Sequence, residues 1–162
     1  MKKVFAAFLV VVMMLSLCAC DASDYKKAMA AYDKGDYKTA RELFEDLGDY
    51  KDSADMAEKS LLKEIDDLLQ GDWEVKSGSI TQTYEFDDGR FTAGMSIGTA
   101  SIDNEGTYRI DTDSKEIYVC YDYIISSSGK KPNTEEKLLF TYTYSGSNFV
   151  LKNSSGDTVD KD

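Results

Sequence analysis

The chain has 162 residues, of which 19 are basic, 30 are acidic and none is histidine, so its formal net charge is −11. A chain this acidic is repelled by nucleic acid and by anionic lipid headgroups, so we expect no nucleic-acid partner. The absence of histidine excludes Ser-His-Asp catalysis, Cys-His catalysis and histidine metal sites.

The first residues have the order of a secretory signal. Two lysines precede an uncharged apolar run at 4–17, and its 14 residues are fewer than the roughly 20 that span a bilayer. The run leads into Leu-Cys-Ala-Cys at 17–20, which resembles the lipobox of bacterial lipoproteins. The resemblance implies a signal peptide at 1–19, cleaved after Ala19, and lipidation of Cys20 with acyl chains such as palmitate. It also implies anchoring at the extracytoplasmic face of the bacterial cytoplasmic membrane. The string LGDYKDSADMA at 47–57 resembles a segment of secreted proteins of Gram-positive bacteria, so we expect a Gram-positive cell surface.

Processing would leave a mature chain with 17 basic and 30 acidic side chains, a net charge of −13. Membrane attachment must then come from acyl chains, because no basic patch assists it. Cleavage without lipidation is the alternative. With Cys20 lipidated, Cys120 is the one remaining cysteine, so no intramolecular disulfide is possible. We expect Cys120 to be a buried small hydrophobe, with a reactive thiol or a disulfide between two chains as the alternatives.

After a short anchor linker at 20–23, residues 24–70 show helical spacing interrupted by glycines. The pattern predicts a helical hairpin around Gly35 and a long third helix that Asp52 or Ser53 caps. The apolar stripe of that third helix comprises Ala54, Ala57, Leu61, Ile65, Leu68 and Leu69. The string AMAAYDKGDYKTARELF at 28–44 resembles one tetratricopeptide repeat. A single repeat lacks the groove that binds peptides, so we expect a structural spacer or a protein-docking module.

From Gly71 onward, aromatic and threonine residues alternate between turn signals, of which Asp88-Gly89 is the strongest hairpin signal. The pattern predicts an α+β protein in which an antiparallel up-and-down meander closes into a small barrel or half-barrel. We expect a polar loop from Ser126 to Glu135 and a polar tail at 156–162. The expected strands are Trp73–Lys76, Ile80–Phe86, Arg90–Ile97, Gly106–Asp111, Glu116–Ile125, Lys137–Ser145 and Asn148–Lys152.

The opening Gly71-Asp72-Trp73, followed by aromatic strands, resembles a lipocalin-like (calycin) barrel over residues 71–155. The resemblance implies that Trp73 plugs the closed end and that a basic residue of the last strand, Lys152, covers it. A barrel of about eight strands is either packed solid or holds one small ligand. The candidate interior residues, which would also contact an amphiphilic ligand, are Trp73, Tyr84, Phe86, Tyr108, Tyr121, Tyr123, Tyr142 and Tyr144.

The acidic residues give no sign of a catalytic or metal centre. Asp87-Asp88, Asp103 to Glu105, and Asp111 with Asp113 all lie in predicted turns and form no calcium loop. We therefore expect a non-enzymatic, lipid-anchored surface protein without cofactor or metal, whose β domain binds a small amphiphilic ligand or a protein partner. The alternative is an envelope assembly or sensing factor, with the helical module as docking surface and the β domain as spacer.

Overall fold

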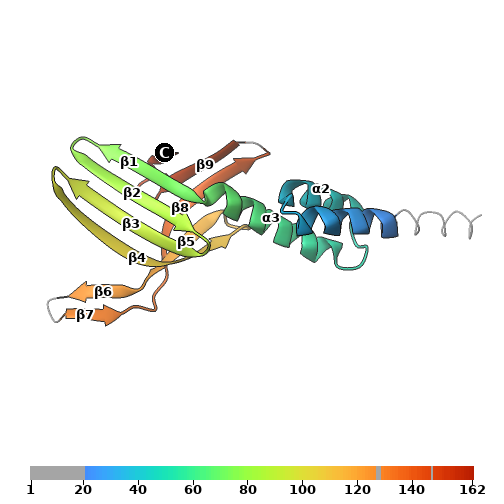
Figure 1. Ribbon diagram of the computed structural model, residues 1–162, viewed down its shortest axis with the longest axis horizontal. Coiled ribbons are helices and arrows are strands. Elements are labelled where there is room, and N and C mark those ends of the chain that lie inside the picture. The colour runs from blue at the N-terminus through green and yellow to red at the C-terminus, as the bar shows by residue number, and fades with distance from the viewer. Residues whose placement is uncertain (1–20, 127–128, 147) are drawn as a thin grey trace, which may run out of the picture. The chain divides into compact units, whose positions relative to one another are not determined.

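The structure is a computed structural model that describes residues 21–126, 129–146 and 148–162. In this part of the chain, three helices precede an antiparallel eight-stranded barrel, which confirms the predicted α+β fold (Figure 1). The chain divides into two compact units, Met1–Glu64 and Ile65–Asp162. The predicted signal peptide and Cys20 lie outside the described residues. None of the helices that the structure describes is long and apolar enough to cross a membrane.

The first unit is helical and has its own small core. A helix at 21–33 is followed by α2 (Tyr37–Leu47) and by the first part of α3 (Ser53–Leu69). The Asp36 side chain caps α2 by accepting a hydrogen bond from the Thr39 N–H at 3.2 Å. Gly35 adopts φ +78° in the turn between the first two helices, a conformation that glycine adopts without strain. The fully buried residues of this core are Ala28, Ala40 and Phe44, with Met56 almost buried beside them.

The buried side of α3 differs from the predicted stripe at its start. Ala54 is exposed, whereas Ser53, Met56 and Ser60 are buried, so the helix is rotated relative to the expected stripe in its first turns. The Ser60 hydroxyl donates to the Met56 carbonyl at 2.7 Å, which satisfies this polar group inside the helix. The stripe is correct toward the other end, where Ile65 and Leu69 are fully buried.

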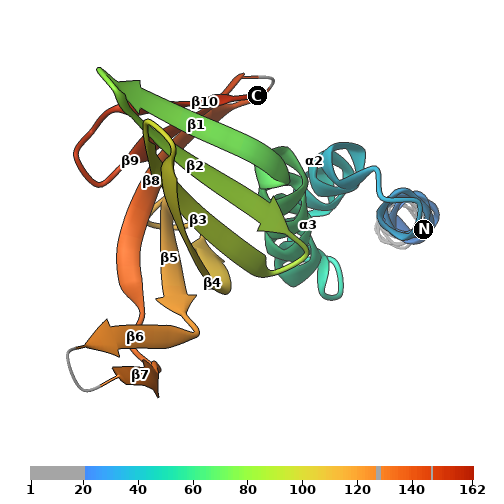
Figure 2. The same ribbon diagram turned by 60° about the vertical axis from the view of Figure 1, so that its left-hand side comes forward.

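The second unit is a closed barrel with the strand order β1-β10-β9-β8-β5-β4-β3-β2 (Figures 1 and 2). Only Gln70 separates α3 from the first strand. A separate two-stranded sheet consists of β6 (Tyr123–Ser126) and β7 (Gly129–Pro132). The barrel strands are β1 (Gly71–Ser77), β2 (Ile80–Asp87), β3 (Arg90–Ile97), β4 (Ala100–Asp111), β5 (Glu116–Tyr121), β8 (Lys137–Ser145), β9 (Asn148–Asn153) and β10 (Thr158–Lys161).

Two of the expected strands differ substantially from those of the structure. β4 begins at Ala100 rather than Gly106. The expected strand Glu116–Ile125 breaks at Asp122, whose N–H donates to the Glu105 carbonyl at 2.8 Å before the chain turns away to form the β6–β7 hairpin. That hairpin occupies part of the expected polar loop.

The region at 156–162, expected as a polar tail, contains β10. This strand pairs with both β1 and β9 and thereby closes the barrel. Only four residues long, it has a single buried side chain, that of Val159, and is otherwise polar. Such a segment shows little of the alternation that identifies a strand in sequence.

Candidate binding site on the inner face of the barrel

Strands β1 to β4 present two chemically different faces. Side chains alternate along a strand, and the pairing register therefore assigns each position to the inside or the outside of the barrel. The outer positions carry seven acidic and three basic side chains. These charged outer residues are Asp72, Glu74, Lys76, Glu85, Asp87, Arg90, Asp103, Glu105, Arg109 and Asp111.

The inner positions form successive rows across the same four strands. The register places Phe86 opposite Phe91 in one row, Tyr84 opposite Ala93 in the next, and apolar and neutral polar residues in the two rows beyond. None of the side chains in those two last rows is charged. They are Val75, Gln82, Met95 and Ile102, followed by Ser77, Ile80, Ile97 and Ala100.

Aromatic rings fill the barrel around the first row. Phe86 and Phe91, both 1% exposed, lie with their ring centroids 5.1 Å apart. The fully buried Phe140 of β8 contacts both rings from across the barrel, at 5.6 and 6.1 Å. Tyr84 completes this cluster with an edge-on contact to Phe140 at 4.8 Å. Rings at these separations stabilise a packed core.

Trp73 lies where the last turn of α3 meets the barrel, and this is the closed end. It is 5% exposed, and its indole N–H donates to the Leu69 carbonyl at 2.7 Å. Lys161 of β10 lies opposite Trp73 in the register, with Nζ 5.2 Å from the ring centroid. The lysine on the last strand is therefore Lys161 and not Lys152, which is exposed on β9. The correction follows from β10, because the expected strand set ended one strand too early.

A hydrogen-bond network around Tyr108 closes the same end. The Tyr108 hydroxyl donates to Asp66 at 2.6 Å and accepts from the Gln70 amide at 2.8 Å. Burial, followed by the hydrogen bond to Asp66, raises the pKa of Tyr108 to about 12. Gln70 also accepts from the Asp88 N–H at 2.8 Å. Gln70 thus joins the end of α3 to the β2–β3 turn, and Tyr108 has a structural role here.

The opposite, open end of the same inner face is apolar and exposed. The exposed fractions of Met95, Ile97 and Ile102 are 42%, 53% and 65%. Met95 and Ile102 are direct cross-strand partners, and Ile97 lies one row further out. Next to them, the Tyr84 hydroxyl donates to the Gln82 side-chain carbonyl at 3.0 Å, so a polar pair borders the apolar surface. Grouped apolar side chains exposed on a barrel interior are typical of a binding surface.

The sequence-predicted interior residues are distributed unevenly around this site. Trp73, Tyr84, Phe86 and Tyr142 are buried, and Tyr108, Tyr121 and Tyr144 are partly buried. Burial raises the pKa of Tyr121 and raises that of Tyr142 to about 12. Tyr123 is 46% exposed on the β6–β7 hairpin, because the chain leaves the barrel at Asp122. Ligand contact by these eight residues stays a prediction.

The sequence analysis missed the three exposed apolar residues of the open end. Met95 and Ile97 belong to the predicted strand Arg90–Ile97, but Ile102 lies before the predicted start of the next strand. The signal that identifies the hairpin is Gly98-Thr99 between two alternating stretches, since glycine at the first turn position suits a two-residue hairpin. Gly98 has φ +63° in the structure.

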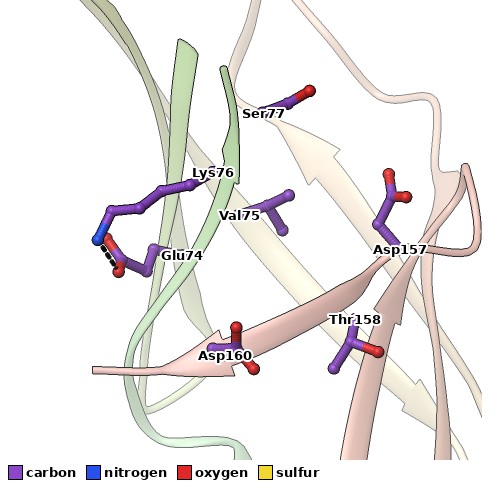
Figure 3. Close-up of a pocket in the computed structure, with 7 residues that line it drawn as sticks. All are labelled: Glu74, Val75, Lys76, Ser77, Asp157, Thr158 and Asp160. Atoms are coloured by element: carbon purple, nitrogen blue, oxygen red, sulfur yellow. Dashed lines mark hydrogen bonds and ion pairs between the residues drawn. The ribbon is translucent and has the colours of Figure 1, made fainter. Parts of the chain in front are cut away.

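A surface hollow borders the open end between β1 and β10. Pairing between these strands stops at Glu74, so Val75 and Ser77 face Asp157 and Thr158 across a gap (Figure 3). Glu74 and Lys76 form an ion pair with each other, and Figure 3 shows both side chains directed away from Val75. In the described residues, no group of three acidic or cysteine side chains is arranged to hold a metal ion. The lining of this hollow is mainly polar, so the hollow offers hydrogen-bonding groups at the border of the apolar surface.

The chain matches no protein-family model, no curated protein and no solved structure.

Proposed function

We propose that this is a non-enzymatic, lipid-anchored protein of the extracytoplasmic membrane face whose barrel binds a small amphiphilic ligand at its open end. The observation that carries the proposal is the exposure of Met95, Ile97 and Ile102 on the inner face, 42%, 53% and 65% respectively. Leaving these side chains in water costs free energy that an apolar ligand would recover, at about 25 cal/mol per Å² covered. The neighbouring Tyr84–Gln82 pair offers a polar group with hydrogen-bonding capacity.

The lipocalin-like resemblance supports this proposal. An eight-stranded barrel has room for side chains or for one small ligand. A tryptophan near the start of the first strand, covered by a basic residue of the last strand, is the arrangement that the resemblance implied, and Trp73 with Lys161 has it. The aromatic cluster fills the level of Phe86 and Phe91, so the ligand would lie beyond it, toward Met95 and Ile97.

We propose the tetratricopeptide-like module as a spacer between the lipid anchor and the barrel. Several of its apolar residues are used internally, because Ala28, Ala40, Phe44 and Met56 pack into one cluster. A single repeat supplies no groove for a peptide. Docking through the helical module, as in an envelope assembly or sensing factor, therefore has less support than ligand binding by the barrel.

A fluorescent-probe titration tests ligand binding. We expect N-phenyl-1-naphthylamine, an uncharged apolar probe, to bind saturably to the protein that lacks residues 1–20. Ile102→Asn should weaken this binding at least tenfold, because it places an amide on the apolar surface. Ile124→Asn is the matched control, since Ile124 is 48% exposed on the separate β6–β7 hairpin. Equal binding by both variants and the parent protein would place the probe elsewhere and contradict the proposal.

A further inference from the structure

Strand β4 has an edge that the other described strands leave open. β5 pairs with β4 only from Gly106 to Asp111, and one further hydrogen bond, from the Asp122 N–H to the Glu105 carbonyl, extends the contact. Before Glu105, β4 pairs only with β3 among the strands that the structure describes. Residues 100–105 are all exposed, and the strand forms the border of the β1–β4 sheet (Figure 1). An exposed strand edge is a template for an added strand.

The backbone direction identifies which groups this edge offers. In an antiparallel sheet, successive residues direct their N–H and C=O groups alternately to the two neighbouring strands. The Glu105 carbonyl points to the β5 side, because it accepts from Asp122, whereas the Tyr108 N–H points to the β3 side and donates to Gly89. Counting back by two residues, Asp103 and Ser101 direct their backbone groups to the open edge.

The side chains along this edge differ in chemistry between the two faces of the sheet. Ile102 projects to the inner face with an exposed fraction of 65%, beside Met95. Asp103 and Glu105 project to the acidic outer face. Glu105 lies 3.8 Å from Arg90, which has a closer pairing of 2.8 Å with Asp122. A strand lying against this edge would thus meet Ala100, Ile102 and the polar Asn104 on one face and carboxylates on the other.

Space for such a strand exists beside the edge. A surface hollow lies between the end of this edge and the β6–β7 hairpin, lined by Asp103, Asn104, Glu105, Asp122, Tyr123 and Lys130. The hollow begins at Asp122, where the chain leaves β5 and no longer runs beside β4. Its lining contains three carboxylates and one lysine.

We propose that the open edge of β4 binds an extended segment of a partner protein by strand addition, and that this segment alternates apolar and basic side chains. Backbone hydrogen bonds to Ser101 and Asp103 would supply affinity, and alternate side chains would supply specificity. The apolar residues would lie beside Ile102, and the basic residues would face Asp103 and Glu105. A second copy of this chain does not fit, because edge-to-edge pairing would bring like carboxylates together.

The test uses the full lipidated chain in nanodiscs of phosphatidylcholine, an uncharged bilayer, and a blocked heptapeptide of alternating lysine and valine. We expect saturable binding, with slowed hydrogen exchange of the Ser101 and Asp103 amides. Ser101→Pro should weaken this binding at least tenfold, because it removes one edge-facing N–H and leaves every charge in place. Ser101→Ala is the matched control and should bind like the parent chain.

The remaining outcomes overturn the proposal. Binding that survives Ser101→Pro would be charge attraction to an acidic protein and not strand addition. Equal binding by the alternating glutamate and valine heptapeptide would contradict the acidic outer face as the selecting feature. Amides of Ser101 and Asp103 that exchange slowly without peptide would show that the chain covers its own edge. Binding of N-phenyl-1-naphthylamine should be unchanged by Ser101→Pro, so this result is independent of the proposed ligand site.

Discussion

Lys161 covers Trp73 and simultaneously ties the last barrel strand to the end of α3. Its Nζ lies 5.2 Å from the Trp73 ring centroid and donates to the Leu68 carbonyl at 2.9 Å. Trp73 donates to the adjacent Leu69 carbonyl. Two of the carbonyls that a helix end leaves without internal partners are thus satisfied by strands of the barrel.

Trp73→Ala should destabilise the barrel more than any exposed substitution. The side chain is 5% exposed and packs against Phe149 at 5.9 Å. Truncating a buried tryptophan costs about 3–5 kcal/mol, a large part of the roughly 5–15 kcal/mol of a typical domain. Urea denaturation should show a sharply lower midpoint. A change of under about 0.5 kcal/mol would place Trp73 outside the core.

Lys161→Met tests the cover over Trp73 separately from its burial. Methionine keeps an apolar stem of similar length but removes the charge and the hydrogen bond to the Leu68 carbonyl. We expect a loss of about 0.5–1 kcal/mol in unfolding free energy, typical of an exposed cation–π contact. Lys152→Met is the matched control and should have no measurable effect. Urea denaturation midpoints measure the stability of both variants. An equal loss of stability in both would argue against a specific contact between Lys161 and Trp73.

Two glycines in β3 and β4 should respond differently to alanine. A Cβ at Gly106 would lie 2.3 Å from the Cys120 carbonyl oxygen and 2.8 Å from the Tyr121 Cα, which are backbone atoms. A Cβ at Gly94 would lie 2.4 Å from the Thr83 hydroxyl oxygen, which is at the end of a side chain.

Gly106→Ala should therefore cost about 1–3 kcal/mol or more, and Gly94→Ala should cost less. Adding Thr83→Ala should recover stability in the Gly94→Ala variant and not in the Gly106→Ala variant. Thermal melts of the four proteins measure this, and rescue of Gly106→Ala by Thr83→Ala would be inconsistent with a backbone clash.

Alkaline pH should destabilise the barrel through its buried tyrosines. The pKa of Tyr108 and that of Tyr142 are both raised to about 12 from the ordinary value of 10.0, in each case mainly by burial. The unfolded chain releases these protons first, so the stabilisation is complete below pH 10 and is lost as pH rises toward 12. Between pH 9 and pH 11, the urea denaturation midpoint should fall less for Tyr108→Phe than for the parent chain. An identical slope would exclude a contribution from Tyr108.

Cys20→Ser should release the protein from membranes. The lipobox resemblance makes Cys20 the acyl acceptor, and the net charge of −11 offers no electrostatic attraction to anionic lipid. In a detergent-partition assay, any processed variant should move to the aqueous phase, and the rest should accumulate as unprocessed precursor. Cys120→Ser is the control and should still partition with detergent. A matured Cys20→Ser protein that remained with lipid would rule out this anchor.

Local sequence patterns are sufficient to predict the fold class and most of the strands. Gly35 and Gly48 interrupt the helical periodicity, and Asp88-Gly89 indicates a hairpin. The alternation of side chains along each strand identifies the two faces of the barrel. All of these are local signals. Local signals also identified Trp73, Tyr84, Phe86 and Tyr142 as inner residues, and all four are buried.

How the barrel closes and where it stays open depend on contacts between segments that are distant in the chain. The β10 strand has one buried side chain, and its pairing with β1 depends on residues almost ninety positions away, as for Trp73 and Lys161. The alternation that predicts an inner Tyr123 continues past Asp122, but β6 pairs with β7 instead of β4. That departure opens the edge of β4. Pairing between distant segments depends on the register of the whole sheet, which a local pattern does not contain.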